Sequence, residues 1–225
     1  MALVNTDSLA ATLDGVNDAL FWSRKLTKEG REGVARWIAS RQGLPGAYAG
    51  MFAPPEEYRT QRLRLFTGEA RASRAGAALV LGNEACRALA LLDVRVSSVQ
   101  EALARAREGM LTRLGPLASG SGTYCCTSCT PAVWRNLAAW DVDDAEAFLA
   151  AGVRSLRGLR LGDGKWRAYP FWYTLLALSG TDVPGAIDEM RYAAPVCERT
   201  LGRAASEGLH EQRRREVCRR VLAGC

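Results

Sequence analysis

The sequence is poor in lysine and histidine. Only three of its 30 basic residues are lysines, and His210 is the single histidine. A Ser-His-Asp triad would have to use His210, which falls in a polar C-terminal stretch, and neither a Gly-x-Ser-x-Gly motif nor a Walker-type loop occurs. We therefore expect neither a serine hydrolase nor a P-loop protein.

Long apolar runs and a basic leader are also missing. No stretch approaches the roughly 18 consecutive apolar residues of a membrane span. Residues 1–22 carry Asp7, Asp14 and Asp18 instead of a basic start followed by an apolar run. The seven cysteines are odd in number and sparse for a disulfide scaffold. These absences predict a cytoplasmic protein with reduced thiols and no transmembrane segment.

The net charge of +6 does not by itself indicate a nucleic-acid partner. Arginines are spread along the chain, mostly near Glu or Asp, and the densest run, residues 213–220, is interrupted by Glu216. Because a solvated helix face accounts for such a run, we do not expect nucleic-acid binding from it.

Helix-favouring residues are abundant. Ala, Leu, Arg and Glu dominate while β-branched residues are scattered, and the dominant residues lose little side-chain freedom in a helix. At 225 residues, 48% of them hydrophobic, the chain can bury a substantial core. The composition predicts an all-α fold in a single domain, 1–225.

A pattern of glycines and rings recurs three times. Each copy has an early glycine, two intermediate positions, a second glycine and an aromatic ring. The copies are Gly33-Trp37-Gln42-Gly46-Tyr48, Gly109-Arg113-Ala118-Gly122-Tyr124 and Gly152-Leu156-Arg160-Gly164-Trp166. In the first two copies the later positions follow the early glycine by 4, 9, 13 and 15 residues, and the third copy is one residue shorter.

The repeat predicts tandem αα-hairpins, each with an amphipathic outer helix, a Gly-x-aromatic turn and an apolar inner helix. We expect hairpin turns near 43–48, 115–124 and 162–166, and an insertion over 53–74. The expected inner helices cover about 75–92, 130–139 and 170–178, and two more helices cover 185–203 and 209–222. Two capping-box spacings, Ser98 with Glu101 and Asp143 with Glu146, predict the starts of outer helices.

The repeat resembles the QW repeat of the terpenoid cyclase and protein prenyltransferase superfamily. The first copy matches with Tyr48 in place of tryptophan, the third matches with Arg160 in place of glutamine, and the middle copy keeps Gly122 and Tyr124. The similarity covers about residues 26–200. It implies an α/α toroid around an apolar cavity, here partial or shortened because the chain has room for fewer hairpins than a complete ring. A homodimer is one way to close such a ring.

The resemblance implies a bulky apolar or isoprenoid-like small molecule, or a lipidated partner, bound in a concave pocket. If the protein is an enzyme, it would be a transferase or cyclase. Candidate ligand-binding rings lie in the turns and on the inner helices; they are Tyr48, Tyr124, Trp134, Trp166, Phe171, Trp172 and Tyr173. The alternative for each ring is an ordinary place in the core.

Residues 141–144 (Asp-Val-Asp-Asp) are similar to the DxDD acid of squalene-hopene-type cyclases, which makes Asp143 and Asp144 catalytic candidates. Asp-Val recurs at 93–94 and 182–183, so half of the motif belongs to the repeat. We favour the alternative that Asp143 is an N-cap and Asp144 a first-turn acid that interacts with the helix dipole.

The cysteines of residues 125–129 (Cys-Cys-Thr-Ser-Cys) form the densest chemical cluster of the sequence. The resemblance places a zinc-binding cysteine near Cys129, although threonine stands where that family has aspartate. Cys126 and Cys129 are half of a zinc site, which Cys125, Cys197 or His210 would have to complete. Zinc is therefore the candidate cofactor, with Cys125, Cys126 and Cys129 as its ligands.

Other roles are open for these thiols. A helix N-terminus lowers the pKa of a nearby thiol, so Cys126 and Cys129 are also candidates for a nucleophilic or redox pair. Small, soft side chains that pack at a tight turn are the structural alternative. At the level of the whole protein, the rival functions are a HEAT-like helical scaffold that binds a protein or nucleic acid, and a thiol redox or metal-sensing protein.

Overall fold

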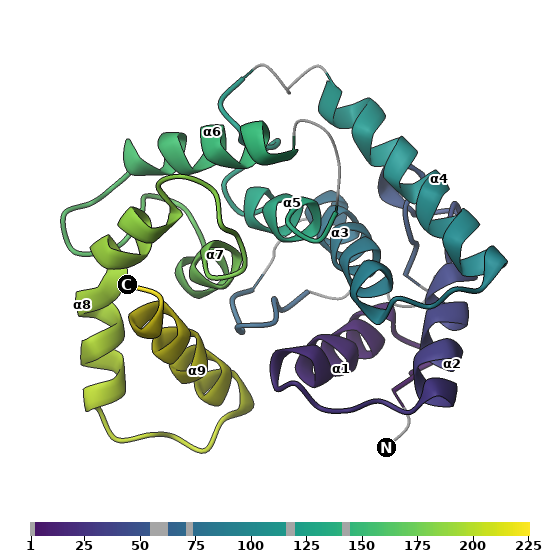
Figure 1. Ribbon diagram of the computed structural model, residues 1–225, viewed down its shortest axis with the longest axis horizontal. Helices are drawn as coiled ribbons and strands as arrows, with labels where there is room; N and C mark the ends of the chain where they lie inside the picture. Colours follow the sequence, from purple (N-terminus) through teal and green to yellow (C-terminus); the bar gives the residue numbers. More distant parts are fainter. Residues whose placement is uncertain (1–2, 55–62, 71–73, 116–119, 141–144) are drawn as a thin grey trace. The chain divides into compact units, whose positions relative to one another are not determined.

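The computed structural model describes residues 3–54, 63–70, 74–115, 120–140 and 145–225, and within them the chain is all-helical (Figure 1). Pairing of extended backbone is limited there to three isolated bridges, so the predicted all-α class is confirmed. The elements are α1 (Leu9–Phe21), α2 (Lys28–Ala39), the 3-10 turn η1 (Tyr48–Gly50), α3 (Arg74–Leu92), α4 (Ser97–Leu114), α5 (Thr130–Leu137), α6 (Ala145–Arg157), α7 (Phe171–Leu178), α8 (Ala186–Gly202) and α9 (Leu209–Ala223).

The chain forms two compact units. The first contains Met1–Leu63 and Arg71–Pro116, and therefore α1 to α4. The second contains Leu117–Cys225, with α5 to α9, and also the short segment Arg64–Ala70. That segment comes from the predicted insertion, so part of the insertion packs with helices that follow it by 60 residues or more in the sequence.

The first unit is organised around α3, which packs against α1, α2 and α4 (Figure 1). Among the described residues, α3 is also the one helix that is long and apolar enough to cross a membrane by length and composition alone. In its window, Ala75–Leu92, 67% of the residues are buried inside the structure. Such burial is typical of a core helix, and the described part of the chain shows no clear transmembrane segment.

The second unit is organised around α7, which packs against α5, α8 and α9, while α8 and α9 lie side by side (Figure 1). Six of the eight residues of α7 are buried. Its first turn is capped from a distant part of the sequence, because Glu69 Oε1 accepts hydrogen bonds from the backbone nitrogens of Trp172 (2.8 Å) and Tyr173 (3.1 Å). A carboxylate at this end of a helix satisfies exposed donors and interacts favourably with the helix dipole.

The three turn glycines of the repeat share one backbone conformation. Gly46, Gly122 and Gly164 have φ angles of 94°, 65° and 89°, in the left-handed region that side-chain-bearing residues seldom adopt. All three positions of the pattern therefore favour glycine for a backbone reason.

Each turn packs against the second α-helix that follows it in the sequence. The backbone of Ala49, in the first turn, lies directly against Gly109 of α4, and that of Gly122 lies against Gly152 of α6. In the third turn, Gly164 faces α8 at Tyr192–Val196. The early glycines of the second and third copies thus make room for the preceding turn. Gly33, the early glycine of the first copy, has open space on the side where a Cβ would lie, with no atom within 4 Å.

Most predicted helices lie where the sequence places them, but one predicted cap is wrong. α4 begins at Ser97 with Val96 as its N-cap residue and without a side-chain cap, so Ser98 does not start a capping box with Glu101. The Val96 carbonyl instead accepts from the backbone nitrogens of Val99 (2.9 Å) and Gln100 (3.0 Å). The second predicted box depends on Asp143, which lies outside the described residues.

Candidate functional site

The structure brings the three cysteines before α5 into one cluster. The sulfur atoms of Cys125, Cys126 and Cys129 all lie within 4.8 Å of one another. Cys125 and Cys126 are exposed, whereas Cys129 is buried. The cluster therefore has one side in the protein and one side toward solvent.

The loop is held in this shape by the first residue of α5. The Thr130 hydroxyl accepts from the backbone nitrogen of Tyr124 (2.9 Å) and lies within donating distance of the carbonyls of Tyr124 (3.0 Å) and Cys126 (2.9 Å). The Cys126 carbonyl also accepts from the backbone nitrogens of Cys129 and Thr130, both at 3.1 Å. These bonds turn the chain so that the three sulfurs face one another.

A hydrogen bond also connects the cysteine loop to the turn before α7. The Thr127 hydroxyl donates to the Ala168 carbonyl at 2.9 Å. The next residue, Tyr169, is buried and stacks on Trp134 of α5 with ring centroids 6.0 Å apart. Threonine thus has a structural role at the position where the resemblance leads one to look for an aspartate ligand.

Two thiols of the cluster, Cys125 and Cys129, have raised pKa values, which favours their protonated forms. Burial raises the pKa of Cys129 well above its ordinary value, and hydrogen bonds and charge from Cys126 and Cys125 raise it further. Burial is also the main reason that the pKa of Cys125 is raised. Burial, with a smaller effect of charge on Cys126, raises the pKa of Tyr169 to about 12.

The expected lowering of the pKa by the helix N-terminus is wrong for Cys129, because burial and the neighbouring thiols outweigh the dipole.

The separation of the sulfurs suits a thiophilic cation. Zinc–sulfur bonds of about 2.3 Å in tetrahedral geometry place the sulfurs about 3.8 Å apart, so thiols already within 4.8 Å need move little. The two other residues considered as ligands lie elsewhere: the Cys197 thiol interacts with Cys218 between α8 and α9, and His210 lies against Gly68. Among the described residues, the site therefore offers three sulfur ligands, two of which are exposed.

Four of the seven predicted ligand-binding rings belong to the core of the second unit. Tyr124, Trp134, Trp166 and Tyr173 are buried, with exposed fractions of 1–4%. Tyr48 begins η1 in the first unit. Catalytic candidates Asp143 and Asp144 lie outside the described residues.

Two residues of the third repeat copy have a structural role. The carboxylate of Glu189, on α8, accepts from Arg160 Nε (3.1 Å), Arg160 Nη2 (2.9 Å) and Trp166 Nε1 (2.8 Å). Glu189 is 1% exposed. The arginine in the glutamine position and the turn ring thus fasten this turn to α8.

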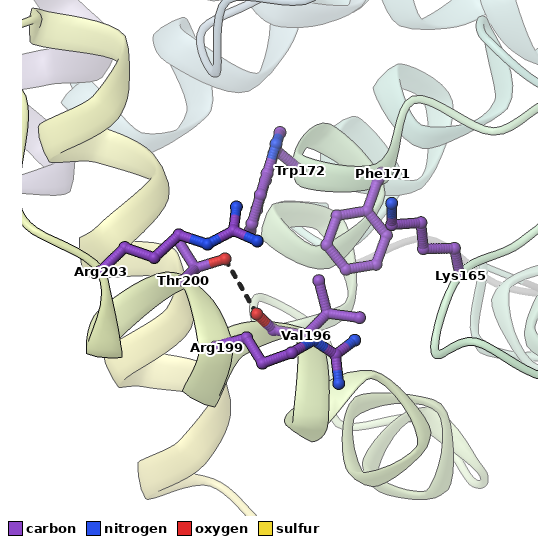
Figure 2. Close-up of a pocket in the computed structure, with 7 residues that line it drawn as sticks. All are labelled: Lys165, Phe171, Trp172, Val196, Arg199, Thr200 and Arg203. Atoms are coloured by element: carbon purple, nitrogen blue, oxygen red, sulfur yellow. Dashed lines mark hydrogen bonds between the residues drawn. The ribbon is translucent and has the colours of Figure 1, made fainter.

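The remaining two rings, Phe171 and Trp172, line a pocket of about 240 Å³ between α7 and α8 (Figure 2). Its other lining residues are Lys165, Val196, Arg199, Thr200 and Arg203. Sequence reasoning missed Lys165, Thr200 and Arg203, because Lys165 precedes the other two by at least 35 residues.

Neither a protein-family model, nor a curated protein, nor a solved structure matches this chain. The similarity to the terpenoid cyclase and protein prenyltransferase superfamily therefore stays a prediction. What the structure defines is an all-helical chain of two compact units, with a three-thiol cluster in the second.

Proposed function

We propose that the protein binds a thiophilic metal ion, with zinc as the first candidate, through Cys125, Cys126 and Cys129. The observation that carries this proposal is the mutual approach of three sulfurs within 4.8 Å at the start of α5. Three neighbouring thiolates repel one another, and a divalent cation bound between them offsets that repulsion.

The exposed side of the cluster determines the kind of site. A structural zinc site is closed by four protein ligands, whereas a site with three protein ligands keeps a position for water or an incoming ligand. With Cys125 and Cys126 exposed, this position faces solvent. The proposed site therefore exchanges its metal or binds a fourth ligand there, as metal sensing or metal-assisted chemistry requires.

The raised pKa of Cys129 disfavours this residue as the attacking thiol of a redox pair. A nucleophilic or redox-active cysteine needs a lowered pKa, so that thiolate is present near neutral pH. The opposite direction holds for Cys125 and Cys129. A metal ion supplies the positive charge that these thiols lack, and it displaces their protons on binding.

The apolar or isoprenoid-like ligand and the toroidal arrangement remain proposals of lower rank. Of the seven rings predicted to bind such a ligand, Phe171 and Trp172 line a pocket, and cations share that pocket with them. The HEAT-like scaffold is supported by nothing beyond the helical repeat itself.

Zinc stoichiometry and its dependence on Cys126 test the proposed site. The purified protein is expected to retain about one Zn²⁺ per chain after dialysis against metal-free buffer, and Cys126→Ser to bind at least ~100-fold more weakly, because one of three sulfur ligands is lost. Competition with a chromogenic chelator measures the affinity, and a thiolate-to-cobalt charge-transfer band in the Co²⁺ form reports sulfur ligation.

Cys225→Ser is the matched control, since Cys225 is an exposed thiol outside the cluster. Equal zinc affinity in the two variants would overturn the proposed site. Because at least the protons of Cys125 and Cys129 must leave, affinity should also rise by about 100-fold per pH unit below their pKa values. An affinity independent of pH would contradict thiol ligation.

A further inference from the structure

The charged side chains that line the pocket between α7 and α8 are all positive. Lys165, Arg199 and Arg203 supply three cations, and no acidic side chain of the described residues lines it. Among the described residues, none of these three side chains takes part in a salt bridge. Elsewhere in this unit Arg160 pairs with Glu189, and both Arg219 and Arg220 pair with Glu216. Three cations around one small space favour an anion in it.

Two rings form the apolar wall of the same pocket. Phe171 and Trp172 meet edge to face, with centroids 4.7 Å apart and an interplanar angle of 77°. Both are half-buried. Figure 2 shows them on one side of the space, with Arg199 of α8 and Arg203, the C-cap residue of α8, on the other. Ring faces at such an angle can hold a planar group by stacking or by edge contact.

The wall is held in place before any ligand arrives. Glu69 fixes the backbone at Trp172, and Trp166 stacks under Phe171 with centroids 5.7 Å apart. Thr200 donates its hydroxyl hydrogen to the Val196 carbonyl at 2.8 Å, so its oxygen is left as an acceptor toward the pocket (Figure 2). A fixed wall lowers the entropic cost of binding.

We propose that this pocket binds a small organic anion that carries a planar ring, of the kind represented by an aryl phosphate or a nucleoside monophosphate. The cations would bind the phosphate, Arg199 and Arg203 with their forked donors, and the rings would pack on the planar group. A volume of about 240 Å³ lies below the usual range for drug-sized ligands of about 300–1,000 Å³, and so fits a ring with one phosphate. This site is separate from the cysteine cluster and does not depend on the metal.

Isothermal titration calorimetry of the full chain measures the binding of two probes, phenyl phosphate and AMP. At least one of the two probes is expected to bind with a Kd below about 1 mM. Phenol, adenosine and inorganic phosphate should each bind at least about tenfold more weakly, because each lacks either the charge or the ring. Failure of both probes at about 5 mM, or inorganic phosphate binding as well as either probe, would overturn the proposal.

Variants connect the binding to the pocket. Arg199→Gln and Arg203→Gln are each expected to weaken binding about tenfold. Arg154→Gln, which removes the same charge from an exposed position of α6 outside the pocket, should leave it unchanged. Equal losses in all three variants would mean that net charge alone attracts the anion. Unchanged binding in Cys126→Ser would separate this site from the metal site.

Discussion

Replacing Gly122 by alanine is expected to lower the free energy of unfolding of the second unit by about 3–5 kcal/mol. An added Cβ would overlap the backbone nitrogen of Gly152 and the carbonyl of Phe148, both part of α6, and neither can move without moving that helix. The φ of 65° adds strain for any side-chain-bearing residue. The Gly122 carbonyl, which accepts from Trp134 Nε1 at 2.8 Å, would be displaced as well.

Urea unfolding measures this loss, and peptide-level hydrogen exchange assigns it to the second unit. Gly109→Ala should be similarly costly in the first unit, because its Cβ would overlap the Ala49 carbonyl. Gly33→Ala is the matched control. This glycine is an exposed helical residue with open space around it, so alanine should stabilise the first unit by about 0.5–1 kcal/mol. A loss of stability in Gly33→Ala similar to that in Gly109→Ala would contradict the role assigned to the turns.

Replacing Glu189 by alanine is expected to cost about 2–4 kcal/mol. The change leaves the Arg160 guanidinium and the Trp166 ring N–H without the carboxylate that accepts from both. Removing one partner of a fully buried ion pair costs about 3–5 kcal/mol. The lower range applies here because the Arg160 side chain is 27% exposed, so water compensates in part.

The neighbouring acid provides the control for this prediction. Asp188 forms an exposed pair with Arg191 at 3.8 Å, with both side chains more than half exposed, so Asp188→Ala should change stability by less than about 0.5 kcal/mol. Thermal unfolding by circular dichroism compares the two variants at the same pH. If Glu189→Ala were no less stable than Asp188→Ala, the buried network would not hold the third turn to α8.

The repeat was the most informative part of the sequence, because its glycines have a backbone requirement that spacing alone can reveal. Gly46, Gly122 and Gly164, which the repeat groups together, all have a positive φ. The meaning of the early glycines could not be derived in the same way. Their neighbours, such as Ala49 against Gly109, belong to another copy, and only the folded chain brings them together.

The cysteine cluster was predictable because its members are close in sequence, and a short loop keeps them close in space. Which aromatic rings line a pocket could not be derived from the sequence in this way. An apolar ring at helical spacing serves a core or a cavity equally well, and Tyr124 and Trp134 proved to be core residues. Glu69, which caps α7, gave no signal either, because its partners lie about 100 residues further along the chain.

The packing of each turn against a helix that follows it in the sequence has a consequence for folding during synthesis. The partner of every turn lies C-terminal to it: α4 for Ala49, α6 for Gly122 and α8 for Gly164. When a turn leaves the ribosome, the helix against which it packs has therefore not yet been fully translated. Because chains elongate at about 5–20 residues per second, each turn is without its partner helix for a period of seconds during synthesis.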